Sequence, residues 1–186
     1  MAYHAGQIPI YYNHPYGSAW HQGESIGFVN YVDLPHTPRY FFGYGLSYTM
    51  FAYEKFAVSA TEIAPDEKLQ LSADVCNTGD RAGDEVVQLY VSDRYASMTR
   101  PVQELVGFVR VHLAAGEKKH IVFTLNPSQL AFLDLDMRWK IEKGVYEFRV
   151  GSSSEDVRAA ATVTVTDNAW IDGKTRAMAA RVEVSV

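Results

Sequence analysis

Pairs of acidic side chains are the residues of this sequence whose types and spacing come nearest to acid–base chemistry. Asp134 and Asp136 stand two positions apart, and therefore on the same side of an extended segment. Two further pairs are adjacent in the chain: Asp66-Glu67 and Asp84-Glu85. Each pair falls in a predicted turn or loop, where Asp and Glu are common because they cap backbone groups and face water. We therefore interpret these carboxylates as structural and predict no catalytic residue in this chain.

The histidines and the single cysteine do not form a metal-binding pattern. None of the 6 histidines has metal-ligand spacing with Cys76 or with a carboxylate. His112 and His120 are expected on exposed faces of strands. The sequence also has no glycine-rich phosphate loop, and no Ser/His/Asp set that spacing alone would support. We expect neither a metal nor a cofactor.

The composition limits the classes of protein that this chain can represent. Its 186 residues suit one domain, or one domain plus part of another. The formal net charge of -5 disfavours general affinity for nucleic acid or for an anionic membrane. With Cys76 alone, no internal disulfide can form. No apolar run is long enough to cross a bilayer, and the start at Met1 does not have the pattern of a signal peptide.

Most of the chain shows the periodicity of short strands. Residues 68–75 alternate, with Leu69, Leu71, Ala73 and Val75 on one face. The same alternation predicts strands over 85–92, 104–111, 119–125, 137–142, 144–150 and 159–165, with turn residues between them. The spacing predicts a mainly β protein, an antiparallel β-sandwich of the immunoglobulin type.

Two local features are expected to hold the later strands in place. Asn126 is expected to cap a single helical turn that has Pro127 at its first position. Tyr146 follows a turn at the start of a late strand, which is the position of a tyrosine corner, whose hydroxyl bonds back to the backbone. The alternative is that Tyr146 is only an inward-facing aromatic residue.

The first fifty residues have a different character. They are rich in Tyr, Phe, Gly, Pro and His and show little periodicity, apart from a short strand predicted over 8–12. A long aromatic segment needs a surface on which its rings can pack, so we expect a strap that lies over a larger body.

Four stretches resemble glycoside hydrolase family 3. Residues 40–49, Tyr-Phe-Phe-Gly-Tyr-Gly-Leu-Ser-Tyr-Thr, are similar to the P-F-G-Y-G-L-S-Y-T segment of that family. Residues 85–91 and 100–108 are similar to its E-V-V-Q-L-Y strand and its R-P-V-K-E-L-K-G-F segment, and residues 6–13 to its G-Q-x-P-x-Y-Y-N segment. The order and spacing agree over roughly residues 5 to 165. The departures are small: Phe41 replaces a proline, and Gln103 and Val106 replace lysines.

The resemblance implies a fold and a chemistry. The fold would be a fibronectin type III-like antiparallel β-sandwich, preceded by an irregular aromatic-rich segment from the end of an α/β-sandwich domain. The family are retaining glycosidases, which need two carboxyl groups about 5 Å apart at the scissile bond. In the family both groups precede the point at which this sequence begins. We therefore expect the chain alone to be inactive, as the non-catalytic C-terminal module of an enzyme that hydrolyses terminal β-linked glucose or xylose.

The first fifty residues hold the candidate binding residues. Aromatic rings stack on sugar faces, and Asn or His can bond hydroxyl groups, so the candidate substrate-binding residues are Tyr11, Tyr12, Asn13, His14 and Trp20. The alternative, which we favour, is that these rings pack between domains. The candidate domain-interface residues, which supply apolar bulk beside two glycines, are Phe42, Tyr44, Leu46 and Tyr48.

The expected organisation has three parts. Residues 1–50 would be the end of the α/β-sandwich domain plus a linker, 51–166 the β-sandwich, and 167–186 an extension with one further strand. The expected partners are the upstream catalytic domains, in the same chain or as a separate one, with a homodimer as a further option. An independent carbohydrate-binding module and a protein-interaction domain are the alternative functions. The compartment depends on an upstream signal that the sequence does not contain.

Overall fold

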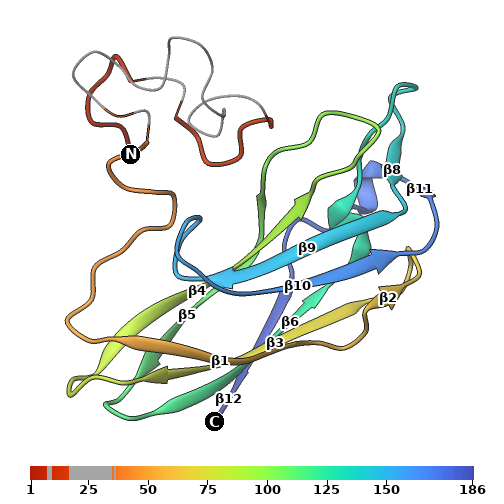
Figure 1. Cartoon of the computed structure of the whole chain (residues 1–186). Helices are drawn as coiled ribbons and strands as arrows, with labels where there is room; N and C mark the ends of the chain where they lie inside the picture. The colour runs from red at the N-terminus through yellow and green to blue at the C-terminus, as the bar shows by residue number, and fades with distance from the viewer. Residues whose placement is uncertain (8–9, 17–34, 36) are drawn as a thin grey trace.

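The protein is a two-layered β-sandwich with an irregular N-terminal segment that lies along one of its sheets (Figure 1). The computed structural model describes residues 1–7, 10–16, 35 and 37–186. The strands and 3-10 helices are, in chain order, β1 (Phe51–Val58), β2 (Glu62–Ile63), β3 (Leu69–Asn77), β4 (Gly83–Asp93), β5 (Glu104–Leu113), β6 (Lys118–Leu125), η2 (Pro127–Leu130), β7 (Phe132–Leu133), β8 (Trp139–Ile141), β9 (Gly144–Gly151), β10 (Val157–Val165), β11 (Ala169–Ile171), η3 (Gly173–Thr175) and β12 (Arg181–Ser185). The predicted mainly β class is confirmed.

Two sheets make the sandwich, and a small third sheet lies at one end. The four-stranded sheet has the order β1-β3-β6-β12, and the five-stranded sheet has the order β2-β10-β9-β4-β5. Every pairing in them is antiparallel except that of β2 with β10. The third sheet, β11-β8-β7, lies at the end of the sandwich where β9 begins and β10 ends (Figure 1).

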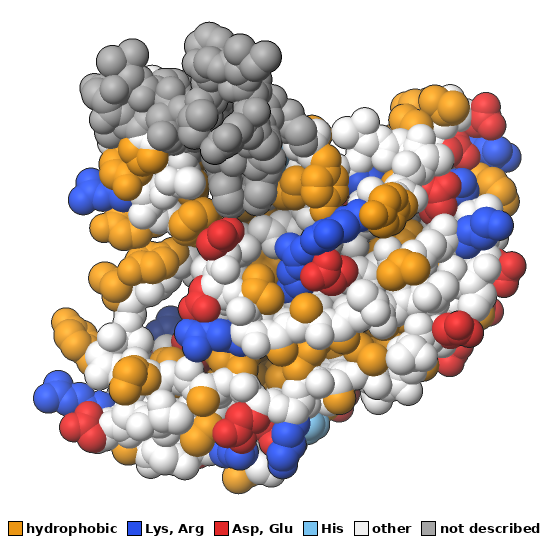
Figure 2. Space-filling view, viewed as in Figure 1, with side chains coloured by type: hydrophobic (Ala, Val, Ile, Leu, Met, Phe, Trp, Pro, Cys, Tyr) orange, Lys and Arg blue, Asp and Glu red, His pale blue; other side chains and the backbone are white. Residues whose placement is uncertain are grey.

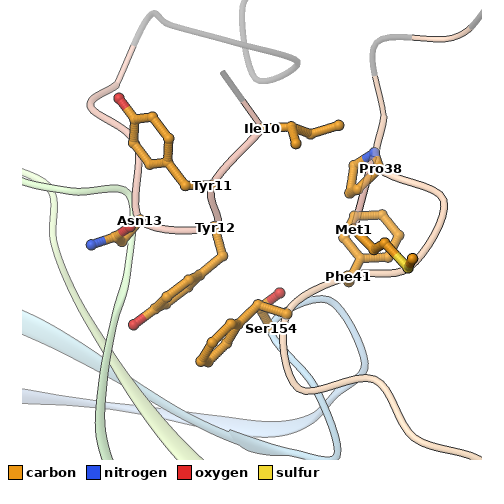
Figure 3. A pocket seen from close by; sticks show the side chains of 9 residues that line it. Met1, Ile10, Tyr11, Tyr12, Asn13, Pro38, Phe41 and Ser154 are labelled. Atoms are coloured by element: carbon orange, nitrogen blue, oxygen red, sulfur yellow. The ribbon is translucent and has the colours of Figure 1, made fainter. Parts of the chain in front are cut away.

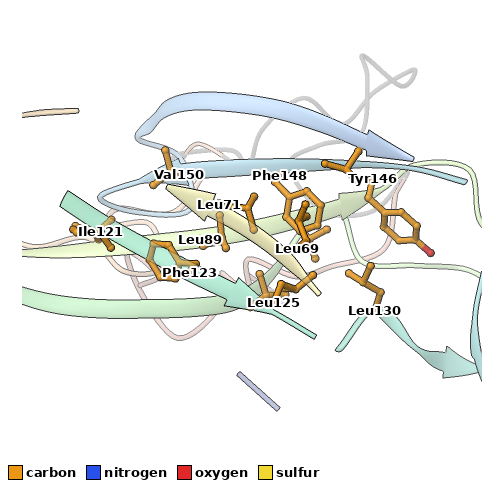
Figure 4. Close-up of a cluster of buried hydrophobic side chains, with 14 of the residues drawn as sticks. Leu69, Leu71, Leu89, Ile121, Phe123, Leu125, Leu130, Tyr146, Phe148 and Val150 are labelled. Carbon is orange, nitrogen blue, oxygen red and sulfur yellow. The ribbon is translucent and has the colours of Figure 1, made fainter. Parts of the chain in front are cut away.

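The core lies between the two main sheets and follows the alternation of the sequence. In β3, the side chains of Leu69, Leu71 and Val75 are fully buried, and the predicted inward residues of β4 and β6 are buried as well. Figure 4 shows side chains from both sheets meeting in this space, with Phe123 from β6 and Phe148 from β9 among the largest. Because each strand contributes every second residue, one slip in register would turn this apolar set toward water.

Two predicted local devices are present. The Asn126 side chain accepts a hydrogen bond from the Ser128 backbone, and Gln129 bonds back to Asn126, which forms a capping box at η2. The hydroxyl of Tyr146 donates to the backbone carbonyl of Glu142 at 2.8 Å, and its ring is buried. The tyrosine-corner interpretation of Tyr146 is therefore confirmed.

Other parts differ from the sequence-based expectation. Residues 10–12 are not a strand, because the chain turns at Tyr12 and Asn13; residues 8–9 lie outside the described part. Over 167–186 the chain forms β11 as well as β12, and β12 pairs with β6 at the edge of the four-stranded sheet.

One buried carboxylate should make the stability of the fold depend on pH. Asp93, at the end of β4, is 7% exposed, and its Oδ2 atom has no hydrogen-bond partner among the described residues. Burial raises the pKa of Asp93, and the nearby Arg100 opposes this shift. Below the unfolded-state pKa of about 3.9 both states are protonated, so no penalty applies. As pH rises through the folded-state pKa, the folded protein must ionise a buried group and loses stability.

We therefore expect Asp93→Asn to raise the free energy of unfolding at pH 7 by about 1 kcal/mol, the lower end of the cost of an unsatisfied buried group. The gain should shrink as the pH falls toward about 3.5, where the wild-type carboxyl is protonated in both states. Urea denaturation at both pH values measures the difference. Asp66→Asn, in an exposed turn, is the control. An Asp93→Asn gain that is the same at both pH values would contradict the assignment.

Candidate docking surface and aromatic pocket

Gln88 anchors the N-terminal segment to the five-stranded sheet. It lies on the outer side of β4, opposite the core residues, yet it is only 3% exposed. Its Oε1 accepts from the Tyr90 hydroxyl at 2.6 Å, and its Nε2 donates to the backbone carbonyls of Gly43 and Ser152. Gly43 has φ +80, and a Cβ there would stand 2.0 Å from Gln88 Oε1. This close approach therefore requires glycine at position 43.

Tyr12 fills the space beside this anchor. Its ring stacks on Phe42 with centroids 4.1 Å apart and meets Tyr90 edge-on at 6.0 Å. Its hydroxyl accepts a hydrogen bond from the Leu105 backbone N–H at 3.2 Å. Segments far apart in sequence are thus joined through aromatic contacts on the outer face of β4 and β5.

The following residues continue along the same face. His14 is 1% exposed, and its carbonyl accepts from the Val102 N–H at 2.9 Å. The Tyr16 hydroxyl lies 3.0 Å from Ser92 Oγ, another buried polar group on the outer side of β4. Burial of these polar residues on the outer side of a strand is explained by the N-terminal segment that covers them.

An apolar pocket opens beside the covered residues. Its volume is about 330 Å³, and it is lined by Met1, Ile10, Tyr11, Tyr12, Asn13, Pro38, Phe41, Phe42 and Ser154. Figure 3 shows Tyr11 and Tyr12 on one side of this space, with Met1, Pro38 and Phe41 opposite. Of the candidate binding residues, Tyr11 and Asn13 are exposed, whereas Tyr12 and His14 are held in contacts with the sandwich. Trp20 lies outside the described residues.

The candidate interface residues form an exposed row on the strap, which we define as residues 40–50. Phe42 and Tyr44 are about half exposed, while Leu46 is 89% and Tyr48 93% exposed; Met50 continues the row at 69%. Figure 2 shows hydrophobic side chains gathered along the edge where this segment descends toward β1. Contiguous apolar exposure of this kind is typical of surfaces that contact another protein, a ligand or a membrane.

The acidic pairs bond within their own loops and strands. Asp134 accepts from the backbone N–H groups of Asp136 and Arg138, each at 3.0 Å, and from the indole N–H of Trp170 at 2.9 Å. These bonds, with that of Arg138 first, lower the pKa of Asp134. This arrangement caps a turn, as the sequence predicts.

The Asp84-Glu85 pair lies in strand β4 and not in the predicted turn or loop, whereas the Asp66-Glu67 pair lies in a turn as predicted. Asp84 binds Arg110 and His112 on the neighbouring strand, and its pKa is lowered chiefly by the Arg110 hydrogen bond. Glu67 accepts from the Ala64 backbone N–H at 3.4 Å. In these contacts, neither pair places its two carboxylates around a shared ligand position.

The described residues contain no group of three or more His, Cys, Asp or Glu side chains placed to hold a metal ion. In the same part of the chain, no helix is long and apolar enough to cross a membrane.

Comparison with known proteins defines the class first. A family model described as a fibronectin type III-like domain matches residues 85–154, which run from β4 into the loop after β9. The match covers the strands that form most of the five-stranded sheet and the Gln88 anchor. These strands therefore belong to a fibronectin type III-like domain.

The relatives then define the family. The chain is 37% identical over 155 residues to a periplasmic beta-glucosidase of Salmonella typhimurium, covering 82% of this chain and 20% of that protein. It is 35% identical over 177 residues to beta-glucosidase BoGH3A of Bacteroides ovatus, covering 85% and 24%. A crystal structure of beta-glucosidase from Listeria innocua in complex with glucose superposes with a TM-score of 0.78 at 38% identity, covering 87% of this chain and 22% of that one.

The chain thus spans about a fifth to a quarter of the length of these relatives. In them the matching region is one part of a larger multi-domain chain. This chain corresponds to the C-terminal portion of a glycoside hydrolase family 3 enzyme, including its fibronectin type III-like domain.

Proposed function

We propose that this chain is a non-catalytic structural module that docks on, and stabilises, the catalytic domains of an enzyme hydrolysing terminal β-linked glucose or xylose. The observation that carries the proposal is the exposed apolar row on the strap, from Phe42 to Met50. The strap is fixed to the sandwich at one end by Gln88 and continues into β1 at the other. Its apolar side chains are therefore held in place for a neighbouring body.

The proposal includes the division of the chain. Residues 1–50 would belong to the end of the preceding domain and the linker, 51–166 to the sandwich, and 167–186 to an extension. This division is supported by the start of β1 at Phe51 and the end of β10 at Val165. The docked position of Tyr12 on Tyr90 supports the view that rings of the first part pack between domains.

A chimera tests the proposal. The matching C-terminal region of the Listeria innocua beta-glucosidase would be replaced by this chain, and hydrolysis of an aryl β-glucoside measured. We expect the chimera to be active and the isolated chain to show no turnover above background. The double substitution Leu46→Ser with Tyr48→Ser should lower the temperature of half-inactivation of the chimera by about 5 °C, equivalent to ~1–2 kcal/mol in a domain of this size.

The matched control uses equally exposed residues on other loops. Leu135 is 86% and Tyr95 88% exposed, so Leu135→Ser with Tyr95→Ser removes the same apolar groups away from the strap. This control should leave the inactivation temperature unchanged. Equal losses in both double variants, or turnover by the isolated chain, would refute the proposal.

A second copy of this chain, as a homodimer, is the rival occupant of the strap. The larger multi-domain relatives favour the preceding domain in the same chain instead. Light scattering on the isolated chain separates the two possibilities. If the chain is a dimer and the double substitution Leu46→Ser with Tyr48→Ser makes it a monomer, the row mediates self-association.

A further inference from the structure

A second pocket lies farther along the outer face of the five-stranded sheet. Its volume is about 260 Å³, and the residues that matter for its chemistry are Tyr16, Arg94, Gln103, Arg149, Ser154 and Glu155. These come from the N-terminal segment, the connection between β4 and β5, strand β9 and the loop after it. The pocket is separate from the one beside Tyr11, with which it shares only Ser154.

Gln103 lines this pocket and carries a buried hydrogen-bond acceptor. Its side chain is 4% exposed, and its Nε2 donates to the backbone carbonyl of Ser154 at 2.9 Å. That carbonyl can only accept, so the orientation of the amide is fixed by this bond. Its Oε1 is buried and has no hydrogen-bond partner within the described part of the chain. A buried acceptor in this state gains free energy when a ligand supplies a donor.

The charged groups around the pocket balance one another. Arg149 donates from Nε and Nη2 to Glu147, each at 3.0 Å, and Arg94 lies 3.4 Å from the same carboxylate. Glu155 is the second carboxylate, and burial raises its pKa while Arg149 opposes that shift. Two guanidinium groups thus face two carboxylates. The balance favours a neutral ligand over an anion or a cation.

The remaining groups favour hydroxyl groups as the polar part of that ligand. An ionised anion such as phosphate has few hydrogen atoms to donate to the Gln103 oxygen. A hydroxyl group, by contrast, can both donate and accept a hydrogen bond. The arginine N–H groups can donate to further hydroxyl oxygens. Tyr16 lines the pocket and is 45% exposed, and its hydroxyl lies 3.0 Å from Ser92 Oγ.

We propose that this pocket binds a single neutral sugar residue, with one hydroxyl donating to Gln103 Oε1, others accepting from Arg94 or Arg149, and the apolar face of the ring against Tyr16. The volume lies just below the range of about 300–1,000 Å³ typical of drug-sized ligands, which suits one sugar ring. The site does not depend on the docking role proposed above, and it uses other residues.

Titration of isotope-labelled protein with D-glucose, D-xylose and cellobiose, followed by NMR, tests the site. We expect the Gln103 side-chain amide, the Ser154 amide and the Arg149 Nε–H signals to shift, with a dissociation constant of about 1 mM. Gln103→Leu should weaken binding at least ~10-fold, because it removes the acceptor. Tyr11→Ala, in the other pocket, should leave binding unchanged.

Thermal unfolding checks that each variant is folded. Should Gln103→Leu fail to fold, Arg94→Ala serves instead, since that side chain is 54% exposed and its loss should weaken binding without unfolding the sandwich. Shifts that appear only with inorganic phosphate or with an alkyl ammonium ion would overturn the proposal. The absence of shifts with every sugar would also overturn it, as would sugar-induced shifts that Tyr11→Ala abolishes.

Discussion

Replacing Phe148 with alanine is expected to lower the free energy of unfolding by about 3–5 kcal/mol, a large part of the ~5–15 kcal/mol that holds a typical domain folded. Phe148 is fully buried in β9, where its backbone neighbours are Val91 on β4 and Ala161 on β10. The two neighbouring strands restrict collapse around the lost ring. A cavity would therefore remain, and its cost adds to the lost transfer free energy.

Urea denaturation measures this effect, with Phe108→Ala as the matched control. Phe108 lies in β5 of the same sheet but is 60% exposed. The control removes the same ring from the solvent side, so its effect should stay within about 0.5 kcal/mol. The denaturant dependence of the free energy should be unchanged in both variants, because the same surface is exposed on unfolding. Similar losses in the two variants would mean that Phe148 is not at the centre of the core.

The parts of the fold that the sequence predicts are those determined by neighbouring residues. Strands β3 and β6 follow directly from period-two alternation, since the inward face must be apolar. The cap at Asn126 and the bond from Tyr146 to Glu142 each join residues at most four positions apart. Local geometry is enough to determine such contacts.

The parts that it does not predict depend on distant residues. Alternation alone would send Gln88 and Ser92 toward water, and it cannot show that they become buried under the first fifty residues. The bond between Gln88 and Gly43 spans 45 positions in the sequence. The pairing of β12 with β6 likewise joins segments that no local pattern links. The one usable signal was the aromatic content of the segment, which predicts that it packs on something but not where.

The candidate site likewise has one part that the sequence predicts and one part that it does not. The sequence predicts an interdomain contact for the apolar residues from Phe42 to Tyr48, and the structure shows that these side chains are exposed. The pocket at Gln103 could not be derived, since its walls come from three segments that are far apart in the sequence and its defining feature is a missing hydrogen-bond partner. An unsatisfied buried atom becomes visible only when all its neighbours are placed.

Gly43→Ala should detach the strap from the sandwich while the two sheets stay folded. An alanine at φ +80 costs about 1–2 kcal/mol in the backbone alone, since L-residues avoid the left-handed region. Its Cβ would also meet Gln88 Oε1 at 2.0 Å, and Gln88 is held in place by Tyr90 and Ser152. The strap has few contacts compared with the two sheets, so we expect the strap to move and the sheets to stay in place.

Hydrogen exchange can locate this movement. The Ser154 N–H donates to the Phe42 carbonyl at 2.9 Å and should exchange at least ~10-fold faster in Gly43→Ala, since 1.4 kcal/mol is a factor of ten. Amides in β3 and β6 should keep their protection, because their hydrogen-bond partners lie within the four-stranded sheet, whereas Gln88 lies in the five-stranded sheet. Gly45→Ala is the control: a Cβ there meets nothing within 4 Å, so protection at Ser154 should be unchanged. If Gly43→Ala and Gly45→Ala have the same effect on exchange at Ser154, the close approach of position 43 to Gln88 does not require glycine. The row from Phe42 onward is then not held in place by that contact. Loss of protection throughout β3 and β6 in Gly43→Ala would instead mean that the strap is an integral part of the sandwich core.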